Sequence, residues 1–180
     1  MSSSIKIEQL LEQCKQNNRL AQMNVYKAYC NAMYNVAFRI VKNDAIAEDV
    51  VQEAFLTAFT DLNKLEDYNA FGSWLKKIVT FKSINELRKD KNVLTPLEGV
   101  AYKLTDSEPE EINITNLKIQ EVFKFINELK DNYRLLLTLH FVEGYDYDEI
   151  VEITGLSYAN CRTTISRAKE SLRKKMAIYA

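Results

Sequence analysis

The sequence predicts an all-α protein, with two small helical domains joined by a flexible linker and a helix-turn-helix at the end of the second domain. Three observations predict this class. Apolar residues recur at helical spacing along most of the 180 residues, glycine and proline number only four and two, and no alternating run bounded by turn residues indicates a strand. Hydrophobic residues make up 47% and charged residues 27%, as in ordinary folded domains.

The first part of the chain has the pattern of a short N-terminal helix followed by two longer helices. The second helix spans about residues 20–41, and Asp44 is placed to cap the third. On the second helix, the residues expected to form an inward-facing stripe are Met23, Tyr26, Cys30, Met33, Ala37, Ile40 and Val41. On the third helix they are Val51, Phe55, Ala58, Phe59 and Leu62. Asp49, Gln52 and Glu53 share an outer face of the third helix, which simple solvation also explains.

A polar loop at residues 63–70 precedes a basic helix that runs to about Lys89. Its cationic residues are Lys76, Lys77, Lys82, Arg88 and Lys89, with Lys91 just beyond. Trp74 and Phe81 follow the helical spacing and so suit a core position. A basic helix with aromatic residues also suits a separated nucleic-acid strand, because bases stack on rings while phosphates pair with cations. The spacing leaves both interpretations open.

The helical pattern lapses between the two halves. Residues 92–116 hold both prolines, Gly99 and the acidic run DSEPEE, which predicts a linker. A new helical pattern starts near Leu117, which predicts about four helices in the C-terminal part.

Residues 145–176 have the pattern of a short helix, a tight turn and a longer basic helix. Asp146 and Glu149 match a capping box, Gly155 is placed to end the first helix, and Ser157 is placed to start the second. The residues of the second helix expected to face inward are Cys161, Ile165, Ala168, Leu172 and Met176. Those expected to face outward are Asn160, Arg162, Thr163, Thr164, Ser166, Arg167 and Lys169. These outward residue types suit base edges and phosphates of a duplex, although a solvated basic helix would have the same composition.

The net charge of −1 hides strong segregation along the chain. Residues 44–67 carry a charge of −6, residues 76–91 carry +4, residues 106–111 carry −4 and residues 162–175 carry +5. Alternating blocks of this kind suit a protein that binds both a basic protein surface and a nucleic acid.

The sequence has few cysteine and histidine residues, the types that often serve in catalysis or bind metals. Cys14, Cys30 and Cys161 lie far apart and suit small core positions, while the single histidine, His140, suits a packing edge. The chain has no glycine-rich phosphate loop and no metal-ligand spacing, so we expect no catalytic constellation, no cofactor and no metal site. The N-terminus lacks the apolar core of a signal peptide and no run approaches the ~20 residues of a membrane span, so we expect a cytoplasmic protein without membrane insertion.

Two separated blocks resemble the extracytoplasmic-function (ECF) group of bacterial RNA polymerase sigma factors. The first comprises YKAYCNAMYNVAFRIVKNDAIAEDVVQEAFLTAF at residues 26–59 and FGSWLKKIVTFKSINELRK at residues 71–89. The second is LKDNYRLLLTLHFVEGYDYDEIVEITGLSYANCRTTISRAKESLRKKM at residues 129–176. The resemblance implies a sigma region 2 domain at residues 1–91, a linker at 92–116 and a sigma region 4 domain at 117–180.

The resemblance also implies partners and site residues. Core RNA polymerase would hold the acidic face of Asp49, Gln52 and Glu53 through its beta-prime clamp helices, and its beta flap would pack on the C-terminal domain. The residues implied for the minus-ten promoter element are Asn69, Trp74, Lys76, Lys77, Lys82, Arg88 and Lys89. Those implied for the minus-thirty-five element are Ser157, Tyr158, Asn160, Arg162, Thr163, Ser166, Arg167 and Lys169. Many relatives are held by an anti-sigma factor, and the sequence leaves open whether this chain is.

The chain departs from the family pattern at a few positions. Thr80, Phe81 and Asn85 stand where the family usually has an Arg-Asn pair and a later Asp, and Thr164 stands where it often has Arg. Threonine cannot make the bidentate contact with guanine that arginine makes. The alternative is a stand-alone helix-turn-helix regulator with an N-terminal sensor or dimerisation domain, but such a protein has no need of AEDVVQEAF followed by a basic tryptophan helix.

Overall fold

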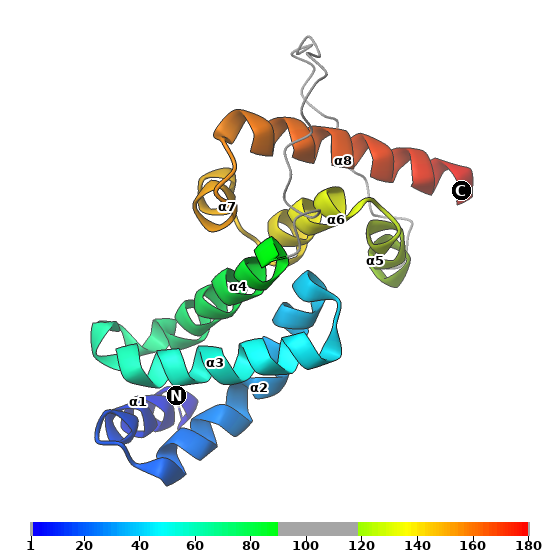
Figure 1. Ribbon diagram of the computed structural model, residues 1–180. Helices are drawn as coiled ribbons and strands as arrows, with labels where there is room; N and C mark the ends of the chain where they lie inside the picture. Colours follow the sequence, from blue (N-terminus) through cyan, green and yellow to red (C-terminus); the bar gives the residue numbers. More distant parts are fainter. Residues whose placement is uncertain (1, 90–118, 180) are drawn as a thin grey trace. The chain divides into compact units, whose positions relative to one another are not determined.

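The computed structural model describes residues 2–89 and 119–179, and within these ranges all regular structure is helical, as predicted (Figure 1). The chain divides into two compact units, Met1–Lys89 (unit 1) and Asp90–Ala180 (unit 2). The predicted linker, residues 92–116, lies outside the described residues.

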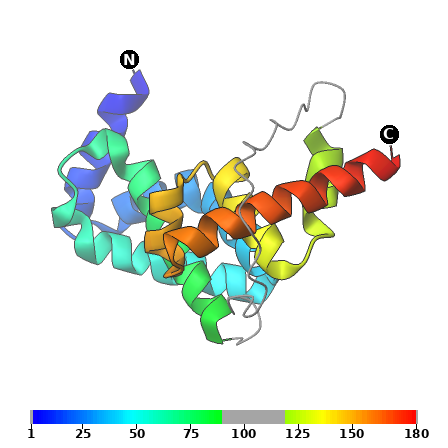
Figure 2. The same cartoon turned by 90° about the horizontal axis from the view of Figure 1, so that it is seen from above.

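Unit 1 is built from four α-helices. They are α1 (Ser2–Lys15), α2 (Arg19–Val41), α3 (Asp44–Asp61) and α4 (Phe71–Lys89), with the 3₁₀ turns η1 (Leu62–Lys64) and η2 (Tyr68–Ala70) between α3 and α4. The helices α2, α3 and α4 pack on one another, and α1 packs on α2, η1 and η2. Figures 1 and 2 show α1 beside the connection from α3 to α4.

Asparagine side chains cap the N-termini of α2 and α3. Asn18 accepts hydrogen bonds from the backbone N–H groups of Leu20 and Ala21 at the start of α2. Asn43 caps α3 by accepting from the N–H of Ile46 at 3.0 Å. The sequence-based assignment of this cap to Asp44 is wrong by one residue, because Asp44 already belongs to the helix and its carboxylate accepts from the Tyr34 hydroxyl.

The buried residues of α2 differ in part from the inward-facing stripe predicted for this helix. Ala21 and Val25 of α2 are 1% and 0% exposed, whereas Met23 is 50% exposed. Ala21 and Val25 lie four residues apart and so share the inward face, whereas Met23, two residues from each, points away from that face. Phe71 and Leu75, at the start of α4, are fully buried.

In its described part, residues 119–179, unit 2 has four α-helices and one π-helical turn. They are α5 (Ile119–Asn127), α6 (Asp131–Leu137), the π-helix η3 (Thr138–Val142), α7 (Tyr147–Thr154) and α8 (Tyr158–Tyr179). Figure 2 shows α8, coloured orange to red, as the longest helix of the unit. It packs on α5, α6 and α7. The core comprises Leu135, Leu137, Leu139, Ile150, Ile153, Cys161, Ile165, Ala168 and Leu172.

The three cysteines are free thiols. Cys14 and Cys161 are core residues as predicted, whereas Cys30 is half-buried. Burial raises the pKa of Cys14 to about 11 and also raises the pKa of Cys161. Among the described residues, no cluster of His, Cys, Asp or Glu could hold a metal ion. Over the same residues, no helix is both long and apolar enough to cross a membrane.

Candidate functional site

The acidic face predicted on α3 is open to solvent. Asp49, Gln52 and Glu53 are all exposed. Glu53 also pairs with Lys82 of α4, with its Oε2 3.5 Å from the lysine Nζ, and the two side chains are 63% and 27% exposed. An exposed pair of this kind stabilises a protein by only about 0–1 kcal/mol. A protein partner with basic groups can therefore compete for Glu53 at little cost.

An apolar groove adjoins this acidic face, and sequence reasoning missed it. A hollow of about 510 Å³ lies between α2 and α3. It is lined by Arg19, Gln22, Met23, Tyr26, Gln52, Phe55, Leu56 and Phe59. Leu56 is 69% exposed, and nearby Leu20 is 71% exposed. The run AFLTAF holds more large apolar side chains than one helix face can bury, and this excess was the available signal.

The loop between α3 and α4 presents polar side chains. Asn69, predicted to meet the minus-ten element, is exposed on η2. The Asp67 carboxylate accepts from both the backbone N–H and the side-chain amide of Asn69, at 2.9 and 3.1 Å. The side chain of Asn69 is therefore held in one orientation on the surface of the loop.

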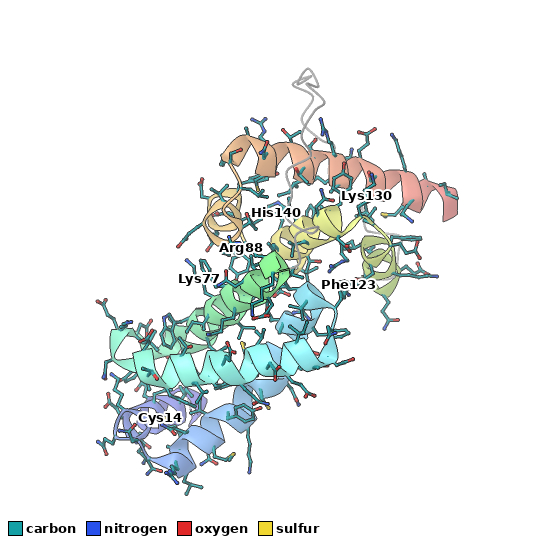
Figure 3. All side chains as sticks on the ribbon, viewed as in Figure 1. Cys14, Lys77, Arg88, Phe123, Lys130 and His140 are labelled. Atoms are coloured by element: carbon teal, nitrogen blue, oxygen red, sulfur yellow. The ribbon has the colours of Figure 1, made fainter. Side chains whose placement is uncertain are left out.

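One side of α4 carries a stripe of aromatic and basic residues. Trp74, Lys77, Phe81, Asn85 and Arg88 recur at intervals of three, four, four and three, which places them on one face of the helix. None of the five is buried, whereas the opposite side of α4 packs into the core. Figure 3 labels Lys77 and Arg88 on this helix. The interleaving of rings and cations is the pattern used to bind single-stranded nucleic acid.

An apolar hollow opens beside this stripe. Its volume is about 370 Å³, and it is lined by Thr57, Trp74, Lys77, Ile78, Phe81 and Lys82. Trp74 and Phe81 are half-buried and line an open hollow, so neither is a fully buried core residue. The α3 side chain Thr57 completes the hollow, and its position could not be inferred from the spacing of α4.

The other predicted minus-ten residues are placed unequally around α4. Lys82 and Lys89 flank the stripe and pair with Glu53 and Glu86, respectively. The hydrogen bond with Glu86 raises the pKa of Lys89. Lys76 precedes Lys77 by one residue, so it lies about 100° around the helix axis from Lys77 and away from the stripe.

The helix-turn-helix of unit 2 forms as its sequence predicts. Asp146 accepts from the N–H of Glu149 at 2.8 Å, and the Glu149 carboxylate accepts from the N–H of Asp146 at 3.0 Å, completing the capping box. Gly155 ends α7 in the left-handed region, with φ of 71°. The Ser157 hydroxyl then accepts from the N–H of Asn160 at 3.2 Å and starts α8.

Most of the predicted minus-thirty-five residues line the outer face of α8. The exposed ones are Ser157, Tyr158, Asn160, Arg162 and Ser166, and the half-buried ones are Thr163, Arg167 and Lys169. The residues between them, Cys161, Ile165 and Ala168, are fully buried. The front of α8 therefore presents polar side chains of a size and type that reach base edges.

Lys169 is the exception on this face. Its Nζ lies 5.1 Å from the centre of the Phe141 ring, a cation–π contact with an aromatic residue of η3. Burial, and then the nearby Arg173, lower the pKa of Lys169. The ammonium is thus directed along the unit's own surface. His140, labelled in Figure 3, is at a packing edge as predicted: its Nδ1 lies 2.8 Å from the Tyr145 carbonyl and its ring stacks on Tyr147.

Comparison with protein families gives a match in each unit. The family model for sigma-70 region 2 matches residues 25–93, and the model for sigma-70 region 4 matches residues 119–172. The two models together cover most of the chain. The hypothesis of a stand-alone helix-turn-helix regulator leaves the region 2 match unexplained.

Similar proteins align with most of the chain. The chain is 26% identical over 180 residues to the ECF RNA polymerase sigma factor SigW of Bacillus subtilis, covering 94% of this chain and 96% of the relative. It is 29% identical over 153 residues to SigM of the same organism, covering 83% and 91%. It is 26% identical over 186 residues to the sigma-E factor of Escherichia coli K12, covering 98% and 97%.

Two solved structures share the fold. One is CnrH in complex with the cytosolic domain of CnrY, with a TM-score of 0.53, 19% identity and coverage of 97% of this chain and 99% of that one. The other is the sigma factor RpoE in complex with the anti-sigma factor NepR from Bartonella quintana, with a TM-score of 0.53, 20% identity and coverage of 87% and 96%.

The two regions stand in the same chain in the order of a sigma factor, and relatives of similar length match nearly all of it. The capped helix-turn-helix and the basic, aromatic helix of unit 1 suit the promoter-binding role of that family. The chain therefore belongs to the ECF group of RNA polymerase sigma factors, the initiation factors that bind core RNA polymerase and direct it to promoter DNA.

Proposed function

We propose that three separate surfaces of the chain bind core RNA polymerase and the two promoter elements. The acidic face of α3 binds the beta-prime clamp helices of core polymerase, the stripe of α4 and the η1–η2 loop bind the minus-ten element, and the front of α8 reads the minus-thirty-five element. The observation that carries the proposal is the α4 stripe, where rings and cations alternate beside an open apolar hollow. We retain domain boundaries of 1–91, 92–116 and 117–180 as part of this proposal.

The α4 stripe supports a role in strand opening. A base that leaves the duplex loses its stacking, and an aromatic side chain restores about 1–3 kcal/mol per base. Trp74 and Phe81 offer ring surface, while Lys77 and Arg88 lie on the same face to pair with the phosphates. The unit therefore favours the open promoter by binding the separated strand more tightly than the duplex.

The acidic face and the apolar groove between α2 and α3 form one proposed polymerase interface. Gln52 belongs to the acidic face and also lines the groove, so the two surfaces are continuous. Leu56, 69% exposed, supplies apolar area next to charges that orient the partner. Both similar solved structures are complexes with a second protein, and in one complex this second protein, NepR, is named as an anti-sigma factor. An inhibitory partner that covered this groove would exclude polymerase.

The beta flap is proposed to pack on unit 2, as the family resemblance implies. The chain is proposed to act without catalytic chemistry of its own, because its family consists of initiation factors that leave RNA synthesis to polymerase. Its working place is proposed to be the cytoplasm, where core polymerase and the chromosome are.

Replacement of Phe81 tests the proposed role in opening. Holoenzyme with Phe81→Ala should bind core polymerase normally but open the promoter several-fold less, because one stacking surface is lost. Permanganate reactivity of unpaired thymines measures the opening. Lys27→Ala, at an exposed position of α2 outside the α4 stripe and the loop, is the control. Equal opening by the wild type and the Phe81 variant would remove the hollow from the mechanism.

A further inference from the structure

Helix α1 contacts the loop that carries Asn69 through residues that lie far apart in the sequence. The Tyr68 hydroxyl of η2 donates a hydrogen bond to the Glu12 carboxylate of α1. The Lys15 ammonium lies 4.7 Å from the centre of the Tyr68 ring, and 3.9 Å from the Glu12 carboxylate. Tyr68 is thus held on one side by a hydrogen bond and on its face by a cation.

These contacts matter because the loop has little stabilising structure of its own. The turns η1 and η2 have three residues each, and 3₁₀ turns of this length have poor hydrogen-bond geometry. Buried Leu62 and Leu65 anchor the first part of the loop, whereas no residue of η2 is buried. The contacts with α1 therefore hold the exposed second part.

Asn69 follows Tyr68 directly, so the position of Tyr68 sets the position of Asn69. A carboxylate only accepts hydrogen bonds, so the amide NH₂ of Asn69 faces Asp67. The carbonyl oxygen and the second N–H of Asn69 are left for the edge of a base. Discrimination between bases requires that such a group be held in place before binding, since a mobile group adapts to several edges.

We infer that Glu12, Lys15 and Tyr68 are positioning residues for promoter reading, which hold the η2 turn so that Asn69 meets an unstacked base of the minus-ten element. This inference rests on the proposed function of the loop. It assigns a role to α1, a helix that lies before the matched residues 25–93 of region 2. The neighbouring Tyr68 side chain, and to a lesser extent the charge of Glu12, raises the pKa of Lys15.

The test measures base selectivity in the full holoenzyme. Core polymerase with the full-length chain is titrated with fork promoter DNA whose minus-ten non-template strand is unpaired, and each unpaired base is varied in turn. Tyr68→Phe keeps the ring but removes the hydroxyl. It should lower the ratio of affinities for the preferred and the other bases by roughly three- to tenfold at one position, with core binding unchanged.

Conservative and control variants separate positioning from simple stability. Glu12→Gln keeps an acceptor and should retain most of the selectivity that Glu12→Ala loses. Glu8→Ala, one turn away on α1 and of the same charge, should behave as the wild type. In a chain that already carries Asn69→Ala, Tyr68→Phe should have no further effect, because both changes act through the same contact.

The outcomes distinguish the inference from the proposed function. If the wild-type holoenzyme selects no base at any unpaired position, the proposed role of the loop is wrong and the inference fails with it. If the wild type selects a base and Tyr68→Phe selects it equally well, only the inference is wrong. A Tyr68→Phe effect that persists in full after Asn69→Ala would also overturn it.

Discussion

Single residues on α8 differ in what they offer to DNA, although the sequence gives several of them the same charge. Arg162 is exposed at the front of the helix, whereas Lys169 lies over Phe141 and has a lowered pKa. The difference arises because η3 brings Phe141 to the side of α8. We therefore expect Arg162 to be more available to a base edge than Lys169.

Arg162→Ala should weaken promoter binding by about 1–3 kcal/mol if the guanidinium contacts a base, with reduced discrimination at one minus-thirty-five position. Lys174→Ala removes the same charge further along α8 and is the control. Competition binding of the holoenzyme to promoters with single changes in the minus-thirty-five element measures both effects. An Arg162 variant with unchanged discrimination would remove this residue from the reading face.

Cys14 should make the stability of unit 1 depend on alkaline pH. Burial raises its pKa from the ordinary value of 9.0 to about 11. Between these values the unfolded chain loses the proton while the folded chain keeps it, so the free energy of unfolding falls as pH rises, by up to roughly 3 kcal/mol. Below pH 9 the thiol is neutral in both states and this contribution is fully present.

The fluorescence of Trp74, the single tryptophan, follows the unfolding of unit 1 in urea. Other groups titrate in the same range, so the informative quantity is the difference between the wild type and Cys14→Ala. The wild type should lose more stability than the variant between about pH 8 and about pH 10.5. Parallel losses would show that the thiol does not keep a raised pKa in the folded state.

At the scale of elements, the helix-turn-helix could be predicted because its signals are local. Asp146, Glu149, Gly155 and Ser157 act within four residues of themselves, and each has the role that its type and position predict. The loop between α3 and α4 could not be predicted in the same way. Tyr68 and Glu12 are 56 residues apart, and no local pattern marks their contact.

The capping box should contribute measurably to unit 2. Asp146→Ala removes one side of it and should destabilise α7 by about 1 kcal/mol. Far-UV circular dichroism reports both units, whereas Trp74 fluorescence reports unit 1 alone, so the variant should lower the thermal transition in the first signal only. Asp148→Ala, an exposed charge in the first turn of the same helix, is the control. Equal shifts for the two variants would contradict a specific role of the cap.

Faces of helices were predicted less well than the helices themselves. Met23 fits the apolar pattern of its helix but does not lie on the buried face assigned to it, because neighbouring helices decide which side is covered. Trp74 and Phe81 show the same limit: their spacing indicates a core, and the packing of α3 on α4 leaves them lining an open hollow. The alternative use for single-stranded DNA was visible in the charges around them.

For the whole molecule, the segregation of charge is the feature that joins structure to function. The acidic exposed face of α3 and the basic stripe of α4 lie in one unit, and a second basic face lies on α8 of the other. A chain with near-zero net charge thus carries separate acidic and basic surfaces, which we propose serve a protein and DNA, respectively. On the proposed function, polymerase would hold the chain while both units contact DNA, so we expect promoter specificity to benefit from avidity.

The most direct test of the whole account is the association of the full-length chain with core RNA polymerase at low salt. Reversal of the acidic face, Asp49→Lys with Glu53→Lys, should abolish association while circular dichroism stays unchanged, because basic groups on the partner would then face lysines. Glu8→Lys with Glu121→Lys changes the net charge equally and should bind as the wild type. Retained binding by the α3 variant would contradict the assigned interface, and failure of the wild type to bind polymerase would contradict the account as a whole.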